Sequence, residues 1–310
     1  MSDPSPNQRV NPFRRDEALT TPNPPLKCTH DAHCTCHVDI DHANESYEFF
    51  QTALKGVGTL QEAGLFVAVG GPTGCGKTSL VNRCATWARK RLESENTKTL
   101  LLNFSGLERD GQTIERRVRK VGTRMYQEVS STQQLVTADL PQIDRKIDIE
   151  ELTYALSRAM APDTVLIVIA PPAERADEVA AYWAGTQQKM LVFSESSDEG
   201  LHRRKNEWKI NNVAQPIYLR TGPLRPGDGV AFRNARINIP GRGETFPDLD
   251  PDAIDEFTGG RDLSIGSVQT LLWMIYEHYK NNPWPTGDIV RRRDLTSFIE
   301  KDLEGRAGKL

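Results

Sequence analysis

The stretch that most constrains this chain runs from residue 65 to residue 78 and joins two different patterns. Residues 65–70 read LFVAVG, a short apolar run that is typical of a strand buried on both faces of a parallel sheet. Residues 71–78 read GPTGCGKT, which fits the pattern G-x-x-x-x-G-K-S/T of a phosphate-binding loop. Apolar residues then recur at helical spacing from Leu80 to Leu92. The sequence therefore predicts a strand, a glycine-rich loop and a helix in direct succession.

The residue types of this loop suit the chemistry of a triphosphate. Glycines let the backbone curl closely enough to aim N–H groups at phosphate oxygens, and the following helix adds further free N–H groups. Lys77 would contact the β- and γ-phosphates, and the Thr78 hydroxyl would bind Mg²⁺. The alternative is a glycine-rich turn without a ligand. The flanking strand and helix favour a nucleotide site, for which we expect Gly71, Pro72, Thr73, Gly74, Cys75, Gly76, Lys77, Thr78 and Ser79.

Length and charge set the class of protein. With 310 residues the chain suits one large domain plus a smaller one, and its net charge of −3 creates no global field toward nucleic acid or membrane. The longest apolar runs, such as residues 165–170, are too short to span a bilayer, and the N-terminus lacks the layout of a secretory signal. Cys75 and Cys84 lie in or beside the predicted site, where a reduced thiol is expected. We therefore expect a cytoplasmic protein.

The N-terminal part of the chain divides into two segments. Residues 1–27 are rich in proline and lack apolar periodicity, which predicts a disordered tail. Residues 28–43 form a Cys/His-rich entry segment, in which Cys28, His30, Cys34 and Cys36 are candidate zinc ligands. The spacing fits no standard zinc finger, and the alternative is a polar entry segment packed on the nucleotide domain.

Beyond the loop, apolar strands alternate with helices. Strands are expected at residues 99–104, 165–170, 190–193 and 216–219, and helices at 44–63, 114–125, 149–160 and 173–183. Such alternation predicts an α/β fold with a parallel sheet covered by helices, here a P-loop domain over residues 44–222. The strand signal then fades, and three helical pieces predict a small helical lid domain over residues 223–282. Residues 283–310 are expected to contain a C-terminal helix over 289–303.

The helix expected from residue 114 is strongly basic outside its apolar stripe. Its cations are Arg116, Arg117, Arg119, Lys120 and Arg124. Such a helix could follow a phosphate backbone, so nucleic acid is a candidate partner. A solvated face or a subunit contact is the alternative.

The layout of residues 45–280 resembles the AAA+ family of P-loop ATPases, closer to its initiator- and STAND-like branches than to protein unfoldases. The phosphate loop is the specific part of this resemblance. In that family the strand ending at Ala170 would be the Walker B strand, closed by an acidic pair that holds Mg²⁺ and polarises the attacking water. Here Ala170-Pro171-Pro172 follows, and the first acid is Glu174, so the resemblance implies a degenerate Walker B.

The resemblance also implies three further roles. Ser194, after the next strand, matches the sensor residue that contacts the γ-phosphate or the water, with Ser196 as second choice. Arg203 or Arg204 lies where the family places an arginine finger that reaches the neighbouring subunit's nucleotide. Arg261 resembles the arginine with which the lid closes over the nucleotide. Against these roles, charged loops and surface arginines are common in proteins.

These expectations lead to two main functional hypotheses. The first is an ATP- and Mg²⁺-binding module that switches conformation or assembles with copies of itself or a partner protein, with weak or assembly-dependent hydrolysis. The second is a competent ATPase that regulates a nucleic-acid process of the transposition or replication type. A competent ATPase would need a catalytic carboxylate, for which Glu174 is the first candidate. No guanine-reading N-K-x-D motif occurs, and the choice between ATP and GTP stays open.

Overall fold

A computed structural model describes residues 9–14, 25–27, 36–107, 113–132, 135–137, 148–204, 215–238 and 246–307. Five parallel strands form the main sheet in the order β2-β3-β4-β1-β5. Their bounds are β1 Leu65–Gly70, β2 Lys98–Asn103, β3 Thr164–Ile169, β4 Met190–Ser196 and β5 Ile217–Arg220. The predicted parallel sheet is therefore confirmed, and β4 separates the strand before the phosphate loop from β3.

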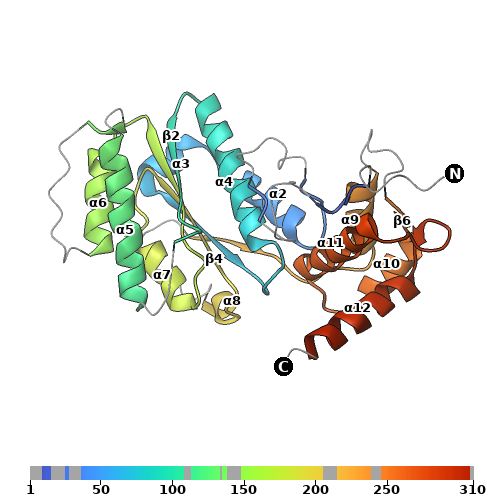
Figure 1. The fold of residues 1–310 in the computed structure, drawn as a ribbon. Helices are drawn as coiled ribbons and strands as arrows, with labels where there is room; N and C mark the ends of the chain where they lie inside the picture. Colours follow the sequence, from blue (N-terminus) through green and yellow to red (C-terminus); the bar gives the residue numbers. More distant parts are fainter. Residues whose placement is uncertain are drawn as a thin grey trace.

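Helices cover both faces of this sheet (Figure 1). The first layer is formed by α2 Ala43–Ala53, α3 Val57–Ala63 and α4 Lys77–Ser94. The second layer is formed by α5 Ile114–Ser131, α6 Ile149–Ala159, α7 Ala176–Ala184 and α8 Gly200–Arg204. Because successive strand side chains point to opposite faces, β4 sends Leu191 and Phe193 toward the α4 layer and Val192 toward the α5 layer. All six residues of β1 are buried, as the apolar run predicts.

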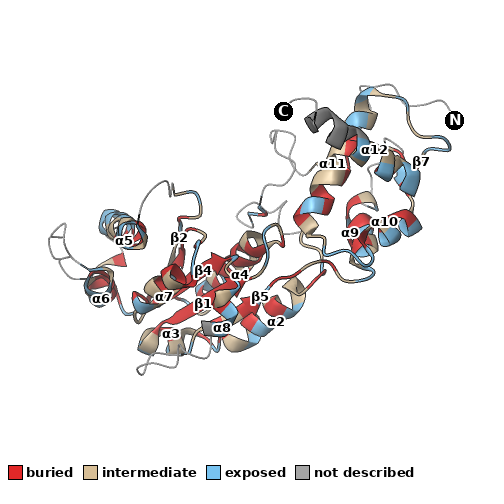
Figure 2. Ribbon diagram, turned by 90° about the horizontal axis from the view of Figure 1, so that it is seen from below, coloured by how far each residue is buried: buried red, intermediate tan, exposed pale blue. Residues whose placement is uncertain are grey.

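The C-terminal helices form a second, smaller body beside the sheet (Figure 2). They are α9 Asp228–Ile237, α10 Pro251–Thr258, α11 Ile265–Asn281 and α12 Arg292–Ala307. Their core contains Phe232, Leu272 and Tyr276, and no side chain of the main sheet contributes to it. The structure confirms the prediction of a small helical domain after the sheet. One detail was wrong: Ile289–Val290 is not helical but forms β7, which pairs with β6, Asp248–Leu249.

Residues 9–14 of the N-terminal segment pack on this lid, whereas Leu26 forms hydrogen bonds with Ser79 and Asn82 of α4. Phe13 is fully buried against Phe232 and Tyr276, with ring centroids 6.0 and 5.1 Å away. Asn11 donates a hydrogen bond to the carbonyl of Trp273 at 2.9 Å, and Gln269 donates one to the carbonyl of Phe13 at 2.7 Å. The prediction of a disordered tail over residues 1–27 is therefore wrong for 9–14 and 25–27. The other residues of that tail lie outside the described part.

Within the described residues, no helix is long and apolar enough to cross a membrane. This finding agrees with the short apolar runs of the sequence.

Candidate nucleotide site

The phosphate loop leaves β1 at Gly70 and enters α4 at Lys77. Gly71, Gly74 and Gly76 have φ values of 152°, 81° and 77°, which L residues with side chains rarely adopt. A Cβ atom on Gly71 would also lie 2.4 Å from the carbonyl oxygen of Thr221. The loop thus needs glycine for both its conformation and its close packing. The N-terminus of α4, with its unpaired N–H groups, opens at this point.

Lys77 lies folded back on its own loop. Its Nζ donates hydrogen bonds of 2.8 Å to the carbonyls of Gly71 and Pro72 and to the hydroxyl of Ser197. Burial lowers the pKa of this ammonium, and the negative charge of Glu195 opposes that shift. The loop therefore holds a largely buried cation beside the position where phosphates would bind.

The acid nearest to this cation is Glu195, which our sequence interpretation missed. Glu195 is the sixth residue of β4 and is 5% exposed, and its Oε1 accepts a 2.6 Å hydrogen bond from the Thr78 hydroxyl. Its side chain points to the α4 face because it shares the parity of Phe193. The available signal was the polar triplet Ser194-Glu195-Ser196 at the end of an apolar strand.

The residues present fit a magnesium ion. Mg²⁺ prefers hard oxygen ligands, few of them from protein, and completes its shell with water and substrate phosphates. Thr78 supplies a hydroxyl oxygen and Glu195 a buried carboxylate at one place. These two side chains could hold Mg²⁺ directly or through water.

A cavity of about 340 Å³ extends from the loop toward the lid. Its phosphate-loop wall contains residues 73–80. Its lining also contains the apolar residues Leu26, Val38, Ile40 and Phe232, from the N-terminal segment and α9. The N-terminus of α11 closes one side, where the N–H of Gly266 donates to the carbonyl of Gly74 at 2.9 Å. The volume falls within the range of small-molecule sites.

Glu174, the first candidate for a catalytic acid, does not line this cavity. Its carboxylate accepts a 3.1 Å hydrogen bond from Arg117, and its side chain is 57% exposed. Arg117 also binds Glu178 through two hydrogen bonds of 3.1 and 2.8 Å, and Glu178 is fully buried. The carboxylates after β3 therefore join α5 to α7. The expectation that Arg117 lies on the basic outer face of α5 is wrong, since it points inward.

Ser194 lies on the other face of the sheet from Glu195. It shares the parity of Val192, which packs in the α5 layer, and its hydroxyl is buried without a hydrogen-bond partner among the described residues. The neighbouring Ser196 also has this parity, and its hydroxyl accepts a 3.1 Å hydrogen bond from the N–H of Asp198. The geometry therefore favours Glu195 over Ser194 and Ser196 as the β4 residue that faces the loop.

Two of the three candidate arginines, Arg203 and Arg261, do not line the cavity. Arg203 is exposed on α8, and the side chain of Arg204 lies outside the described part of the structure. Arg261 is exposed and lies over the ring of Phe257, 5.0 Å from its centroid. The finger role of Arg203 or Arg204 and the lid role of Arg261 therefore stay predictions.

Of the four candidate zinc ligands, Cys28, His30 and Cys34 lie outside the described residues. Cys36 is half-buried, and its carbonyl accepts a 2.8 Å hydrogen bond from Arg236. The described residues contain no group of three or more His, Cys, Asp or Glu side chains that could hold a metal ion. The structure therefore lends the zinc hypothesis no support.

No family model matches the sequence, and no curated protein matches it. Solved structures do match in fold. The ORC1 protein of Aeropyrum pernix in complex with DNA has 16% identity and a TM-score of 0.54, with 86% of this chain and 66% of that chain covered. This chain thus spans just under two thirds of that ORC1 chain.

Two further structures agree. Drosophila ORC bound to DNA has 13% identity and a TM-score of 0.52 over 94% of this chain and 69% of that one. The Aeropyrum pernix ORC2 protein in ADPNP–ADP complexes has 12% identity and a TM-score of 0.52 over 94% and 72%. At these identities the likeness concerns the fold.

Proposed function

We propose that this chain, whose fold is that of the AAA+ P-loop ATPases, binds ATP with Mg²⁺ and acts as a nucleotide-dependent switch or assembly module. The observation that carries the proposal is the contact of Thr78 with Glu195 at 2.6 Å, in the same loop that holds Lys77. It unites a hydroxyl, a carboxylate and an ammonium where backbone N–H groups converge, which is the donor set of a Mg²⁺–triphosphate site.

Each of these residues has a distinct task in binding. Lys77 exchanges the carbonyls of Gly71 and Pro72 for phosphate oxygens, so a buried cation gains an anionic partner. Thr78 and Glu195 would hold Mg²⁺, which when bound neutralises charge on the β- and γ-phosphates. Gly74 would transmit a movement of the phosphate loop on nucleotide binding to the lid, because its carbonyl accepts the N–H of Gly266 at the start of α11.

Weak hydrolysis is part of the proposal. Among the described residues that line the cavity, the carboxylates are Asp41 and Glu195, and the second is bound to Thr78. The loop after β3, which begins Ala170-Pro171-Pro172, brings no acid to the cavity. Without a carboxylate to orient water, hydrolysis loses about 10²–10⁴-fold in rate. Arg203 or Arg204 would raise the rate only on assembly with a neighbouring subunit.

The test measures ATP binding and ATP hydrolysis side by side over a range of protein concentrations. We expect binding, with turnover below about 1 s⁻¹, the low end of ordinary enzyme rates. Lys77→Ala should weaken binding by about 30- to 5,000-fold, because losing a buried hydrogen-bonded charge costs about 2–5 kcal/mol. Unchanged affinity in Lys77→Ala would refute the site. Fast turnover that does not depend on concentration would refute the switch while leaving the site intact.

A second candidate function, regulation of a nucleic-acid process, is favoured by the outer face of α5. Among the described residues, Arg116, Arg119 and Arg124 have no ion-pair partner, and with Lys120 they line a groove of about 570 Å³ along the helix. Unneutralised cations on one helix face suit a phosphate backbone. Two of the similar structures hold DNA.

This candidate is tested by DNA binding at several salt concentrations. Changing Arg116, Arg119 and Arg124 to glutamine should lower the slope of log affinity against log salt by about 3, one for each lost phosphate contact. Arg91→Gln is the control, since Arg91 is exposed on α4 and pairs with Glu95 at 2.8 Å. Absent or salt-insensitive binding would exclude this function.

A further inference from the structure

The cavity has a second carboxylate, Asp41, which the phosphate-binding residues leave unused. Asp41 lies in the short segment before α2 and is 7% exposed. It lines the same cavity as Val38, Ile40 and Phe232, which form its apolar wall. A flat aromatic base needs such apolar walls and a few polar groups that fix its identity. Asp41 is the one acid of the described residues on that wall.

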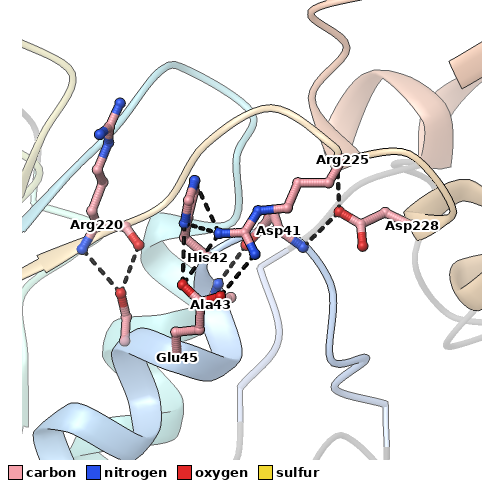
Figure 3. Close-up of polar contacts among 8 residues, drawn as sticks. Asp41, His42, Ala43, Glu45, Arg220, Arg225 and Asp228 are labelled. Atoms are coloured by element: carbon pink, nitrogen blue, oxygen red, sulfur yellow. Dashed lines mark hydrogen bonds and ion pairs between the residues drawn. The ribbon is translucent and has the colours of Figure 1, made fainter. Parts of the chain in front are cut away.

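The backbone holds Asp41 in one orientation (Figure 3). Its φ is 52°, its N–H donates to the carboxylate of Asp228 at 2.8 Å, and its own Oδ1 accepts the N–H of Ala43 at 2.5 Å. The same oxygen of Asp228 also accepts the N–H of Arg225 at 2.7 Å. Asp41 is thus positioned from both sides of the junction between the sheet domain and the lid.

Arg225, whose charge acts on Asp41, is paired with another carboxylate. Arg225 donates to both carboxylate oxygens of Glu45, at 2.7 and 3.2 Å, and contacts the ring of His42 (Figure 3). These hydrogen bonds lower the pKa of Glu45 to about 2, with the Arg225 bond as the largest cause. Arg225 and Asp41 form no direct ion pair, so the Asp41 carboxylate keeps hydrogen-bonding capacity beyond its bond to the Ala43 N–H.

We propose that Asp41 reads the base of the nucleotide bound at the phosphate loop and sets the choice between adenine and guanine. This inference rests on the proposed function. A neutral carboxyl group donates one hydrogen bond and accepts another, which matches the neighbouring acceptor nitrogen and amino group of adenine. An ionised carboxylate only accepts, which matches the two adjacent N–H donors of guanine. The protonation state of one side chain therefore selects the base.

The groups around Asp41 make it change protonation state, and with it the preferred base, near neutral pH. Burial raises the pKa of Asp41 to about 7, and Asp228 adds to the rise, while the N–H of Ala43 and the charge of Arg225 act against it. The site should prefer adenine nucleotides below this pH, and its affinity for guanine nucleotides relative to adenine nucleotides should rise above it. The other ionisable groups around Asp41 come from the entry segment, α2, the phosphate loop, α4 and α9: His37, His42, Glu45, Cys75, Lys77, Arg83 and Arg236. Burial raises the pKa of Cys75 to about 11, so this thiol stays neutral across the range.

The experiment compares the affinities of ATP and GTP at pH 6 and pH 8 by equilibrium binding. In the unaltered protein the preference for ATP should fall by about 5- to 100-fold between these values. A two-bond base contact contributes about 1–3 kcal/mol, and the ratio of neutral to ionised Asp41 changes by about 100-fold over two pH units. Protonation of the triphosphate does not affect the ratio of the two affinities, because ATP and GTP carry the same triphosphate group. A preference that does not change with pH would overturn the inference without any variant.

Asp41→Asn sharpens this test. An amide donates and accepts like the neutral acid and retains an acceptor for the Ala43 N–H, so the variant should prefer ATP equally at both pH values. Asp39→Asn is the matched control and should behave like the unaltered protein, since Asp39 is 65% exposed and faces Arg83 at 3.6 Å.

Two other outcomes would count against the inference. If Asp41→Asn changes the discrimination between ATP and 2′-deoxy-ATP instead, the carboxyl contacts the ribose and the base assignment is wrong. If neither nucleotide binds, or if Lys77→Ala binds both normally, the proposed function fails and the inference fails with it. Binding that requires Lys77 but ignores Asp41 refutes the inference alone.

Discussion

The loops that follow β3 and β4 begin side by side on one edge of the sheet, but their chemistry differs. After β3 the chain continues as Ala170-Pro171-Pro172, and two of its next three carboxylates, Glu174 and Glu178, bind Arg117. β4 ends in polar residues, and its one carboxylate, Glu195, contacts the phosphate loop. Glu174 and Glu178 thus join two helices through Arg117, whereas the acid of β4 lies at the candidate nucleotide site. Strand position alone does not assign a role to a carboxylate; its partner does.

The largest effect on this comparison should come from Glu178→Ala. It leaves Arg117 buried without its main partner, and breaking a buried ion pair costs about 3–5 kcal/mol of the free energy of unfolding. Denaturant titration would measure the loss. Glu174→Ala is the control and should cost less than about 1 kcal/mol, because its carboxylate is mostly exposed. Equal losses in the two variants would contradict a structural role confined to the buried pair.

Glu195→Gln should act on the site and leave stability nearly unchanged. A neutral amide binds Mg²⁺ poorly, so the Mg²⁺ concentration needed for ATP binding should rise by about 10- to 100-fold. The measurement is an Mg²⁺ titration at fixed ATP. Glu174→Gln serves as the comparison and should leave this requirement unchanged. If Glu174→Gln shifts it and Glu195→Gln does not, the acid of the site belongs to the β3 loop after all.

The smallest effect should come from Ser194→Ala. The variant removes a buried hydroxyl that has no hydrogen-bond partner among the described residues, so stability should change by less than about 0.5 kcal/mol or improve slightly. ATP affinity and turnover should stay within about twofold, since Ser194 faces away from the loop. A large loss of turnover with normal binding would show that the α5 face of β4 takes part in the reaction.

Much of the fold could be predicted from sequence because its signals are local. The apolar runs of β1 and β3 and the glycine pattern of the loop need no knowledge of distant residues. The site was harder, because β4 is buried on both faces and its apolar run does not reveal which face holds Ser194 and which Glu195. Only the packing of α4 against one face of the sheet decides which of the two side chains contacts the phosphate loop.

Two other errors have physical causes of different kinds. Arg117 stands three residues after Ile114 and four before Val121, so helical spacing already places it on the inward stripe; its charge led to the wrong interpretation. Phe13 offered no such signal. It is one aromatic residue in a proline-rich segment, and its partners are more than 200 positions later in the sequence. No local pattern can indicate a contact of that range.

The burial of Phe13 in the lid has a consequence for the order in which the protein is made. During synthesis Phe13 leaves the ribosome more than 200 residues before its partners on α9 and α11. The sheet domain lies between them in the sequence and can fold first, whereas the lid core closes only after α11 has emerged. A residue translated before the sheet domain thus reaches its final position only after that domain has formed.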